Sequence, residues 1–487
     1  MRDKLIALGL IAIFLLSSTT VYAGFKINKQ NEDFDPLDDV EITVEIQKIR
    51  SHEKSDRQIF FKEYIDKNTA PDFYVKVFIN DVEFQSETWS NTKYIHEPDW
   101  SATLNVPDDV ETVDVKIQLW DEKDENIKED RLCDLNGERD KYDVELTYNI
   151  KTGHWTGDDF LDLNHEEFDP SGYGRLNGCD DGTIYEKDMD CELWFDIYQN
   201  DFDNDGIPYW TEVNILGTDP EIDDSEIDSD SDGIPNYWEW KWGYDPLTIE
   251  NHNMLDPDED SINNYEEYLT CEWYSDPFRK DVFVELDIME EGPNGEKSYM
   301  PDESKELIAT AFNRRNIMFH LDDGQMGGSD IIPFKDKLDY SEIRDIYETY
   351  FIRDESDNWR RGIFHYGLVV YSTQGAAGFM FRSNAFQVST LGHEYKSENP
   401  ILDRDEVYAS AYMHELGHTF SFWPIPGHDK LSMHPWQLGW WINRPYKSCM
   451  NYGYMYYTVD YSDGSRASPI DLNDWERMSY TSFERDW

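Results

Sequence analysis

Three acidic repeats between residues 200 and 277 set the first limit on how this 487-residue chain can fold. The copies begin at Asp201, Asp228 and Asp256, and each places acidic side chains at positions 1, 3, 5 and 12 of a twelve-residue loop. In an EF-hand loop, a tight turn directs carboxylates at these positions towards a calcium ion. The predicted calcium ligands are Asp201, Asp203, Asp205, Glu212, Asp228, Asp230, Asp232, Glu239, Asp256, Asp258, Asp260 and Glu267.

Position 6 of such a loop favours glycine, because the backbone turns sharply there. Gly206 and Gly233 meet this requirement, whereas Ser261 in the third copy departs from it. The alternative interpretation is a solvated acidic linker. Acidic side chains occupy more than half of the segment 221–232, which would repel itself into a coil without cations. We therefore expect structural calcium sites.

The DxDxDGIP form of the first two copies places Pro208 and Pro235 at position 8 of the loop, unlike an ordinary EF-hand. This form resembles the thrombospondin type 3 repeat. The resemblance implies that calcium holds together segments that have little apolar core of their own.

The overall composition supports a folded, acidic, cation-binding protein. Asp and Glu number 103 against 43 Lys and Arg, so the formal net charge is −60. Such a charge repels nucleic acid and anionic lipid, which excludes general affinity for either. Hydrophobic residues make up 39% of the chain and aromatic residues 15%, more than acidic disordered chains contain. The length predicts two to four domains.

The N-terminus predicts export. Residues 1–23 contain Arg2 and Lys4, then an apolar run over 5–16, then a small-residue cleavage site ending at Ala23. The run is short for a membrane span, although an uncleaved anchor is the alternative. We expect a secreted or cell-surface protein with no integral membrane span after signal removal. Export permits disulfides, and among five cysteines Cys179 and Cys191 are the predicted pair.

Alternating apolar residues predict strands between residues 24 and 150, arranged as an antiparallel β-sandwich. The stretches DFYVKVFINDVEF and VDVKIQLWDEKDE are similar in layout to C2 domains, which implies calcium-binding loops at Asp121 and Asp124. A plain sandwich is the alternative. Residues 151–199 are predicted to be a linker or a small accessory module. Residues 278–487 are predicted to form a separate α/β or α+β domain, with α+β preferred, which makes the chain multidomain.

That last domain contains the motif His414-Glu415-Leu416-Gly417-His418. An apolar stripe predicts a helix here, with Asp403 near its start, so that His414 and His418 lie one turn apart on the same face. Two neutral imidazoles placed in this way can bind one Zn²⁺, and Glu415 lies beside them as a general base. The alternative is a buried core helix with two hydrogen-bonded histidines.

Downstream, Ser448-Cys449-Met450-Asn451-Tyr452 follows the pattern S-x-M-x-Y. With the HExxH helix, it resembles the metzincin metallopeptidases. The resemblance implies that Met450 forms a floor beneath the zinc site and that Tyr452 binds zinc or stabilises the oxyanion.

The zinc helix departs from the metzincin pattern HExxHxxGxxH, because Ser421 and Pro424 stand where glycine and the third histidine are expected. We expect an insertion that brings His428 in as the third ligand. Asp429 and then His434 are the next candidates. Glu476 would be the ligand if the site were of the gluzincin type.

These features predict a secreted zinc-dependent endopeptidase, stabilised by calcium, that hydrolyses peptide bonds in protein or peptide substrates. Glu415 would act as general base towards a zinc-activated water, and Tyr452 would stabilise the oxyanion. An edge strand over 378–390 would hold the substrate in extended form. The rival hypothesis is a non-enzymatic, calcium-dependent surface or adhesion protein with a degenerate peptidase domain.

Overall fold

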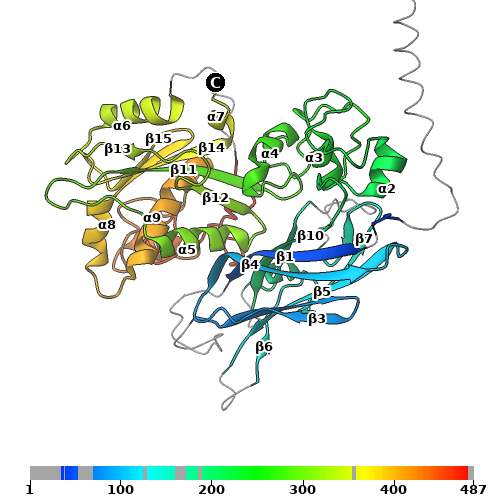
Figure 1. The fold of residues 1–487 in the computed structure, drawn as a ribbon. Coiled ribbons are helices and arrows are strands. Elements are labelled where there is room, and N and C mark those ends of the chain that lie inside the picture. The colour runs from blue at the N-terminus through cyan, green and yellow to red at the C-terminus, as the bar shows by residue number, and fades with distance from the viewer. Residues whose placement is uncertain are drawn as a thin grey trace, which may run out of the picture.

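The computed structural model describes residues 34–37, 39–52, 70–123, 129–159, 172–184, 189–353 and 358–480. The predicted signal peptide 1–23 and Asp124 lie outside the described residues. Figure 1 shows a β-sandwich, a region of loops and short helices, and a C-terminal domain built around a separate sheet. Within the described ranges, no helix has both the length and the apolar character needed to cross a membrane.

The N-terminal sandwich consists of two antiparallel sheets that share one apolar core. The first sheet has the order β4-β1-β10-β9 and the second the order β3-β2-β5-β7-β8, with β6 paired to β5. Apolar side chains alternate along β5 and face the core, as the period-two pattern predicts. The strands are β1 (Val40–Ser51), β2 (Phe73–Ile79), β3 (Val82–Gln85), β4 (Tyr94–Val106), β5 (Thr112–Asp121), β6 (Arg131–Leu132), β7 (Val144–Asn149), β8 (Trp155–Gly157), β9 (Gly174–Asn177) and β10 (Cys191–Gln199).

The predicted sandwich boundary at residue 150 is wrong. The segment 151–199, expected to be a linker or accessory module, contributes β8, β9 and β10 to the two sheets. Strand β10 pairs with β1 from Ile42↔Gln199 to Ser51↔Cys191, because β1 lies inside the sheet and needs a partner on each side. The predicted disulfide between Cys179 and Cys191 is also wrong, since both side chains are buried as thiols.

The acidic repeats form loops that each lead into a short helix. These helices are α2 (Tyr209–Thr211) with the π-helical turn η2 (Glu212–Leu216), α3 (Asn236–Lys241), and α4 (Asn264–Thr270) with the 3-10 turn η3 (Cys271–Trp273). Another 3-10 turn, η1 (Gly178–Asp181), belongs to the sandwich. Trp238 and Trp242 of the second repeat pack with Tyr173 and Trp194 of the sandwich. The repeats therefore share a small aromatic core with the preceding domain.

The C-terminal domain is a largely parallel sheet with helices on both faces, so of the two expected arrangements it is α/β and not α+β. Its strand order is β12-β11-β14-β16-β15, with β13 beside β11 and only β15 antiparallel. Strand β11 is almost completely buried, which requires cover on both faces. The strands are β11 (Asp281–Met289), β12 (Met318–Asp322), β13 (Ile331–Ile332), β14 (Phe364–Val370), β15 (Gly378–Arg382) and β16 (Ala385–Ser389).

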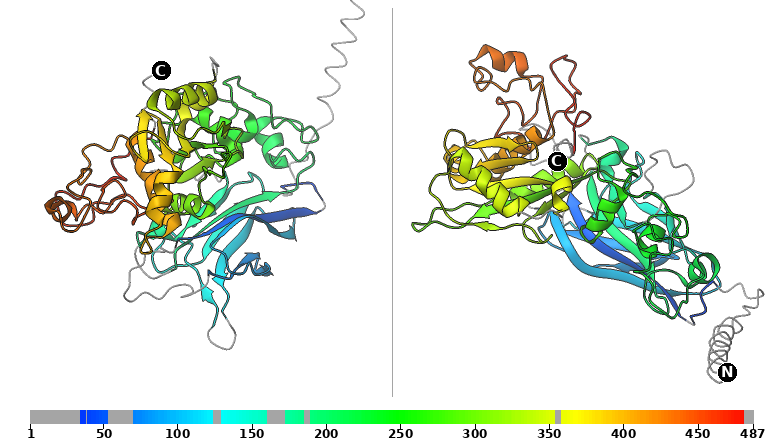
Figure 2. Two further views of the ribbon diagram at one scale, coloured as in Figure 1. Left: turned by 90° about the vertical axis from the view of Figure 1, so that its left-hand side faces the viewer. Right: turned by 90° about the horizontal axis from the view of Figure 1, so that it is seen from above.

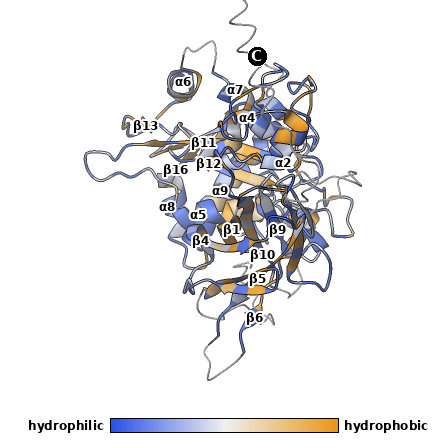
Figure 3. Cartoon of the chain, turned by 45° about the vertical axis from the view of Figure 1, so that its right-hand side comes forward, coloured by the Kyte–Doolittle hydropathy of each residue, from blue (hydrophilic) through white to orange (hydrophobic). Residues whose placement is uncertain are grey.

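Two groups of helices cover this sheet. Helices α5 and α9 pack on one face, and α6, α7 and the π-helical turn η4 pack on the other. Figure 3 shows the outer helices α6 and α8 in hydrophilic blue, with orange concentrated on the strands. The helical elements are α5 (Asp302–Asn313), α6 (Tyr340–Ile346), η4 (Tyr347–Ile352), α7 (Arg360–Ile363), α8 (Thr390–Ser397), α9 (Arg404–Thr419) and α10 (Leu438–Asn443).

The segment that follows α9 has little regular structure and projects from one side of the domain, drawn in orange to red in Figure 2. The predicted edge strand over 378–390 is a hairpin of β15 and β16, in which β15 alone lies at the edge. At the start of α9, Asp403 accepts hydrogen bonds from the backbone N–H of Asp405 and of Glu406, as a helix cap does.

A buried network of charges joins the sandwich to α5. Arg50 of β1 pairs with Glu306 of α5, with 2.7 Å between Nη1 and Oε2. Arg175 of β9 pairs with Glu192 of β10 and donates to the backbone oxygen of Asn313 at 3.1 Å. Burial alone would raise the pKa of Glu192, but the charges of Arg175 and Arg50 outweigh it and hold the pKa at about 2. These contacts fix the sandwich against the C-terminal domain.

We predict that Arg175→Ala destabilises the protein by about 3–5 kcal/mol, since it leaves the Glu192 carboxylate buried with one counter-charge fewer. Guanidinium unfolding in the presence of calcium measures the change. Lys335→Ala is the control, because it breaks the exposed pair with Glu342 and should cost less than about 1 kcal/mol. Equal stability of the two variants would contradict the structural role of the network.

Candidate metal centres

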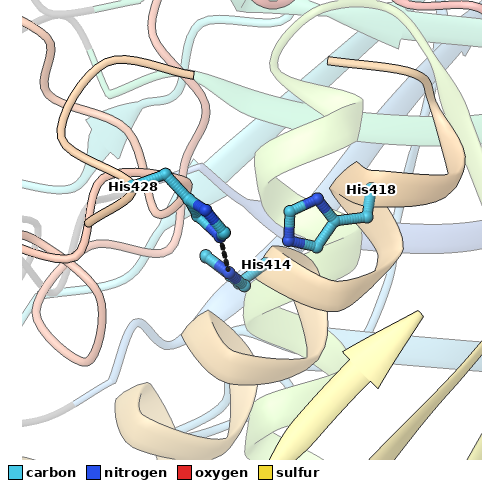
Figure 4. A group of neighbouring side chains, drawn as sticks. All are labelled: His414, His418 and His428. Atoms are coloured by element: carbon cyan, nitrogen blue, oxygen red, sulfur yellow. Dashed lines mark hydrogen bonds between the residues drawn. The ribbon is translucent and has the colours of Figure 1, made fainter. Parts of the chain in front are cut away.

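Three histidines meet beside helix α9 (Figure 4). His414 and His418 lie one turn apart on α9, and His428 comes from the segment that follows the helix. Nε2 of His428 is 3.2 Å from Nε2 of His414, and one ring nitrogen from each of the three residues falls within 4.8 Å of the others. This spacing matches the donor set of a three-histidine zinc site.

The protonation of these rings suits metal binding. Nδ1 of His414 lies 2.8 Å from the backbone oxygen of Cys449, so Nδ1 carries the proton and Nε2 keeps its lone pair for a metal. Burial lowers the pKa of His414 well below its usual value. Burial and the neighbouring His428 lower the pKa of His418 to about 4. The rings are therefore neutral at physiological pH, which is the form that ligates zinc.

The insertion after α9 folds back to deliver His428. Phe422 and Ile425 are buried in the core of the domain, which anchors the loop on either side of Pro424. Gly427 has a φ of +76°, and a Cβ at that position would lie 2.3 Å from Oδ1 of Asn451. Only glycine permits this close approach to the SCMNY turn. The loop thus compensates for Pro424 at the expected ligand position.

The other candidate ligands lie elsewhere. The carboxylate of Asp429 accepts hydrogen bonds from the N–H of Leu431 and the hydroxyl of Ser432, so it caps the next turn and does not orient His428. His434 is exposed and stacks on Trp436. Glu476 is exposed, and its N–H donates to Asn473. Within the described ranges, none of these three candidates joins the histidine cluster.

Glu415 lies beside the cluster under the edge strand. Its side chain is 5% exposed, and burial raises the pKa of its carboxyl to about 8. Gly378, the first residue of β15, packs directly against Glu415. A Cβ added at Gly378 would lie 2.4 Å from Oε1 of Glu415. The ring of Tyr452 lies 4.3 Å from that of His428 between centroids. The structure therefore gathers the predicted base, the predicted tyrosine and an edge strand at one place.

The SCMNY turn packs against α9 and depends on Asp474, a residue that the motif does not contain. The Met450 side chain is buried, and its sulfur would lie 2.4 Å from a Cβ on Gly417. Ser448 donates to Oδ2 of the buried Asp474 at 2.7 Å and accepts from the N–H of Met450. Sequence reasoning missed Asp474, although it lies only two residues before the candidate ligand Glu476.

The three acidic loops share one backbone geometry. In each, the residue at position 6 donates its N–H to the carboxylate at position 1, from Gly206 to Asp201 at 3.2 Å and from Gly233 to Asp228 at 3.0 Å. Ser261 donates in the same way at 3.0 Å and adopts a φ of +73°. Serine at this position therefore leaves the third loop intact.

Each loop also receives a contact from further along the chain. The backbone N–H groups of Asp224, Glu250 and Asp281 donate to the carboxylates at position 5, which lie 19, 18 and 21 residues earlier. Sequence reasoning missed these contacts, because a fixed twelve-residue template stops before them.

The loops bury carboxylate oxygens that lack hydrogen-bond partners, which is the condition that a bound cation would satisfy. Both oxygens of Glu239 and both of Glu267 are of this kind, and so is one oxygen each of Asp203, Asp230 and Asp258. Carboxyl oxygens of Asp203, Asp205 and Glu212 lie within 4.8 Å of one another, as do those of Asp228, Asp230 and Asp232 and those of Asp256, Asp258 and Asp260. The residues present fit calcium, which prefers oxygen ligands.

Asp121, which the C2-like layout suggested as a calcium-binding residue, is buried in a local contact. Its Oδ2 lies 2.5 Å from Nζ of Lys123, and its Oδ1 accepts the N–H of Asp72. The second residue suggested, Asp124, lies outside the described residues. The described part of this loop is therefore held by an ion pair.

No protein-family model matches the chain, and no curated protein sequence matches it. Similar solved structures include a human GIVD cytosolic phospholipase A2 at 13% identity, covering 33% of this chain and 16% of that one, with a TM-score of 0.19. A C2 domain is 12% identical over 32% of this chain and 97% of its own, with a TM-score of 0.18. A C2 domain from a plant extended synaptotagmin 1 is 8% identical over 32% and 92%, also at 0.18.

The structural neighbours therefore include C2 domains, and the match to the phospholipase spans under a fifth of that protein. TM-scores this low support no assignment of family or function.

We predict that His428→Ala lowers zinc occupancy steeply, because two imidazoles alone bind zinc weakly. His434→Ala and Glu476→Gln are the matched controls and should leave zinc content unchanged. Zinc per chain is measured by mass spectrometry after dialysis. Stoichiometric zinc in His428→Ala would show that the third ligand lies elsewhere. Loss of zinc in Asp429→Ala would identify Asp429 as that ligand.

A second prediction concerns the acidic loops without cations. Burial raises the pKa of Asp205 to about 7, of Glu212 to about 8 and of Glu239 to about 7. Between about pH 4 and pH 8 such groups ionise in the unfolded chain but stay protonated in the folded one, so stability falls as pH rises.

In EDTA, we expect the melting temperature to fall across this window and residues 200–277 to become sensitive to protease at its upper end. Added calcium should raise the melting temperature and abolish the fall, because it binds the charged loops of the native state. The same pH profile with and without calcium would contradict the assignment.

Proposed function

We propose that the protein is a secreted zinc-dependent endopeptidase of the metzincin type, stabilised by calcium in its acidic repeats. The observation that carries the proposal is the convergence of His414, His418 and His428 beside a buried Glu415. Each histidine offers a ring nitrogen to one point, and the glutamate lies next to that point on the same helix. If α9 were only a core helix with hydrogen-bonded histidines, a third imidazole from the segment after the helix would not be needed.

His414, His418 and His428 would hold the metal through ring nitrogens. A bound zinc ion supplies Lewis-acid chemistry, polarising the substrate carbonyl and lowering the pKa of water. Glu415 accepts a proton from the attacking water and returns it to the leaving amine. Burial raises the pKa of Glu415 to about 8, so its ionised carboxylate is a stronger base than that of an exposed glutamate, and the charge of a bound metal ion would favour the ionised form.

The surroundings of Glu415 suit an extended peptide substrate. Strand β15 lies at the edge of the sheet, so one side of its backbone can pair with an added strand. Because Gly378 lies against Glu415, a peptide paired with β15 would pass close to the base. The Tyr452 ring lies beside that of His428, and its hydroxyl is proposed to donate to the developing oxyanion. Protein or peptide is therefore the proposed substrate class.

Glu415→Gln tests the proposal most simply. The ligands are untouched, so zinc should be retained, whereas casein hydrolysis should fall by about 10²–10⁴-fold, as loss of a general base does. Turnover of Glu415→Gln close to that of the wild type would show that Glu415 is not the general base. Bound zinc without hydrolysis in the wild-type protein would instead favour the calcium-dependent surface protein with a degenerate peptidase domain.

Gly378→Ala gives an independent readout of the same arrangement. Its Cβ would press on the Glu415 carboxylate, so zinc should stay while hydrolysis falls. Gly362→Ala is the matched control, because the nearest atom to its Cβ, Oε1 of Glu266, is 3.6 Å away. Equal activity of these two variants would show that the backbone of β15 does not constrain Glu415.

A further inference from the structure

The middle acidic repeat differs from its neighbours, because a histidine reaches into its cluster of carboxylates. Nε2 of His252 lies 3.2 Å from Oδ2 of Asp232 and 3.4 Å from Oε1 of Glu239. One ligand atom from each of these three residues falls within 4.8 Å of the others. Two carboxylates and one imidazole thus converge at the end of the second loop.

The converging side chains are buried, and Oδ2 of Asp232 accepts a hydrogen bond from the N–H of Glu250. His252 is 1% exposed and Glu239 is 0% exposed. Nε2 of His252 and both carboxylate oxygens of Glu239 have no hydrogen-bond partner in the described structure. Buried polar groups of this kind are costly unless something binds them. A protonated His252 would pair with both carboxylates, whereas a neutral His252 ring would let a cation bind its nitrogen together with the carboxylate oxygens.

The other side of the His252 ring fixes its orientation. Nδ2 of Asn264 lies 3.2 Å from Nδ1, and Oδ1 of Asn264 has no hydrogen-bond partner among the described residues. Turning the amide over would place Oδ1 against Nδ1, where it would accept the proton of that nitrogen. With the amide in that orientation, Nε2 keeps its lone pair directed at Asp232 and Glu239. Metal-binding histidines are commonly held by a hydrogen bond of this type.

All three loops receive an acidic residue in the equivalent place. The segments that donate their backbone N–H to position 5 carry Asp224 in the first repeat, Glu250 in the second and Asp281 in the third. The second repeat differs because His252, two residues after Glu250, adds a nitrogen donor to the cluster. Calcium favours sets made of oxygen atoms, whereas imidazole is a good ligand for zinc and other first-row transition metals.

We propose that Asp232, Glu239 and His252 bind a zinc-class transition-metal ion in the middle repeat, while the first and third repeats bind calcium. The site uses none of the residues of the histidine cluster on α9. The proposal of a metal in the middle repeat can therefore be tested independently of the proposed peptidase activity. It changes the metal assigned to one of the three loops in the proposed function.

Zinc counting in the full-length protein tests this proposal. The background variant carries His414→Ala and His418→Ala, which remove the cluster on α9. With calcium in excess and zinc as the added probe, this protein should bind one zinc ion per chain. Adding His252→Ala should lower the zinc affinity at least tenfold while the calcium content stays at two ions per chain. Should the background variant fail to fold, the wild type and His252→Ala are compared directly, with two zinc ions expected against one.

His252→Asp is the second variant, because it restores a set made of oxygen donors. It should lose the zinc ion and raise the calcium content from two ions to three. Retained calcium in the first and third loops shows that both variants are folded. Unchanged zinc in His252→Ala would overturn the proposal, as would loss of calcium with zinc unaffected, because the middle repeat would then be an ordinary calcium loop.

Discussion

The burial of many carboxylates is the constraint on which the rest of this structure depends. Acidic residues outnumber basic ones by 103 to 43, so most acids have no lysine or arginine to pair with. The chain compensates for the buried acids in two ways. At the junction of the sandwich and α5, arginines neutralise Glu192 and Glu306. In the repeats the carboxylates face one another, and the proposed cations provide the missing charge.

Glu415 is the exception, and its isolation suits the proposed chemistry. Burial alone raises its pKa, since no neighbouring charge perturbs it further. A carboxylate kept free of ion pairs retains its capacity to take a proton. The repeats and the C-terminal domain are also connected, because Asp281, the first residue of β11, donates its N–H to Asp260 of the third loop at 2.6 Å. Cation binding in that loop would stabilise the start of the sheet that supports α9.

Features encoded within a few residues were predictable from the sequence. The HExxH helix, the acidic loops and the strand at β11 all follow from spacing or periodicity. The position of His428 followed from the need for a third ligand beyond Pro424. The pairing of β10 with β1 was not predictable, because it joins segments that no local pattern relates. The same holds for the contacts of Asp474 with Ser448 and of His252 with Glu239, which arise only when distant segments pack together.

An anomalous difference map at the zinc absorption edge, from crystals of the calcium-bound protein, tests the central claim most directly. The account predicts a peak bonded to Nε2 of His414 and to ring nitrogens of His418 and His428, at about 2.0–2.1 Å, with Glu415 beside it. An ordered histidine cluster that shows no anomalous peak in zinc-loaded crystals would contradict it. So would a peak there whose third protein ligand is not His428.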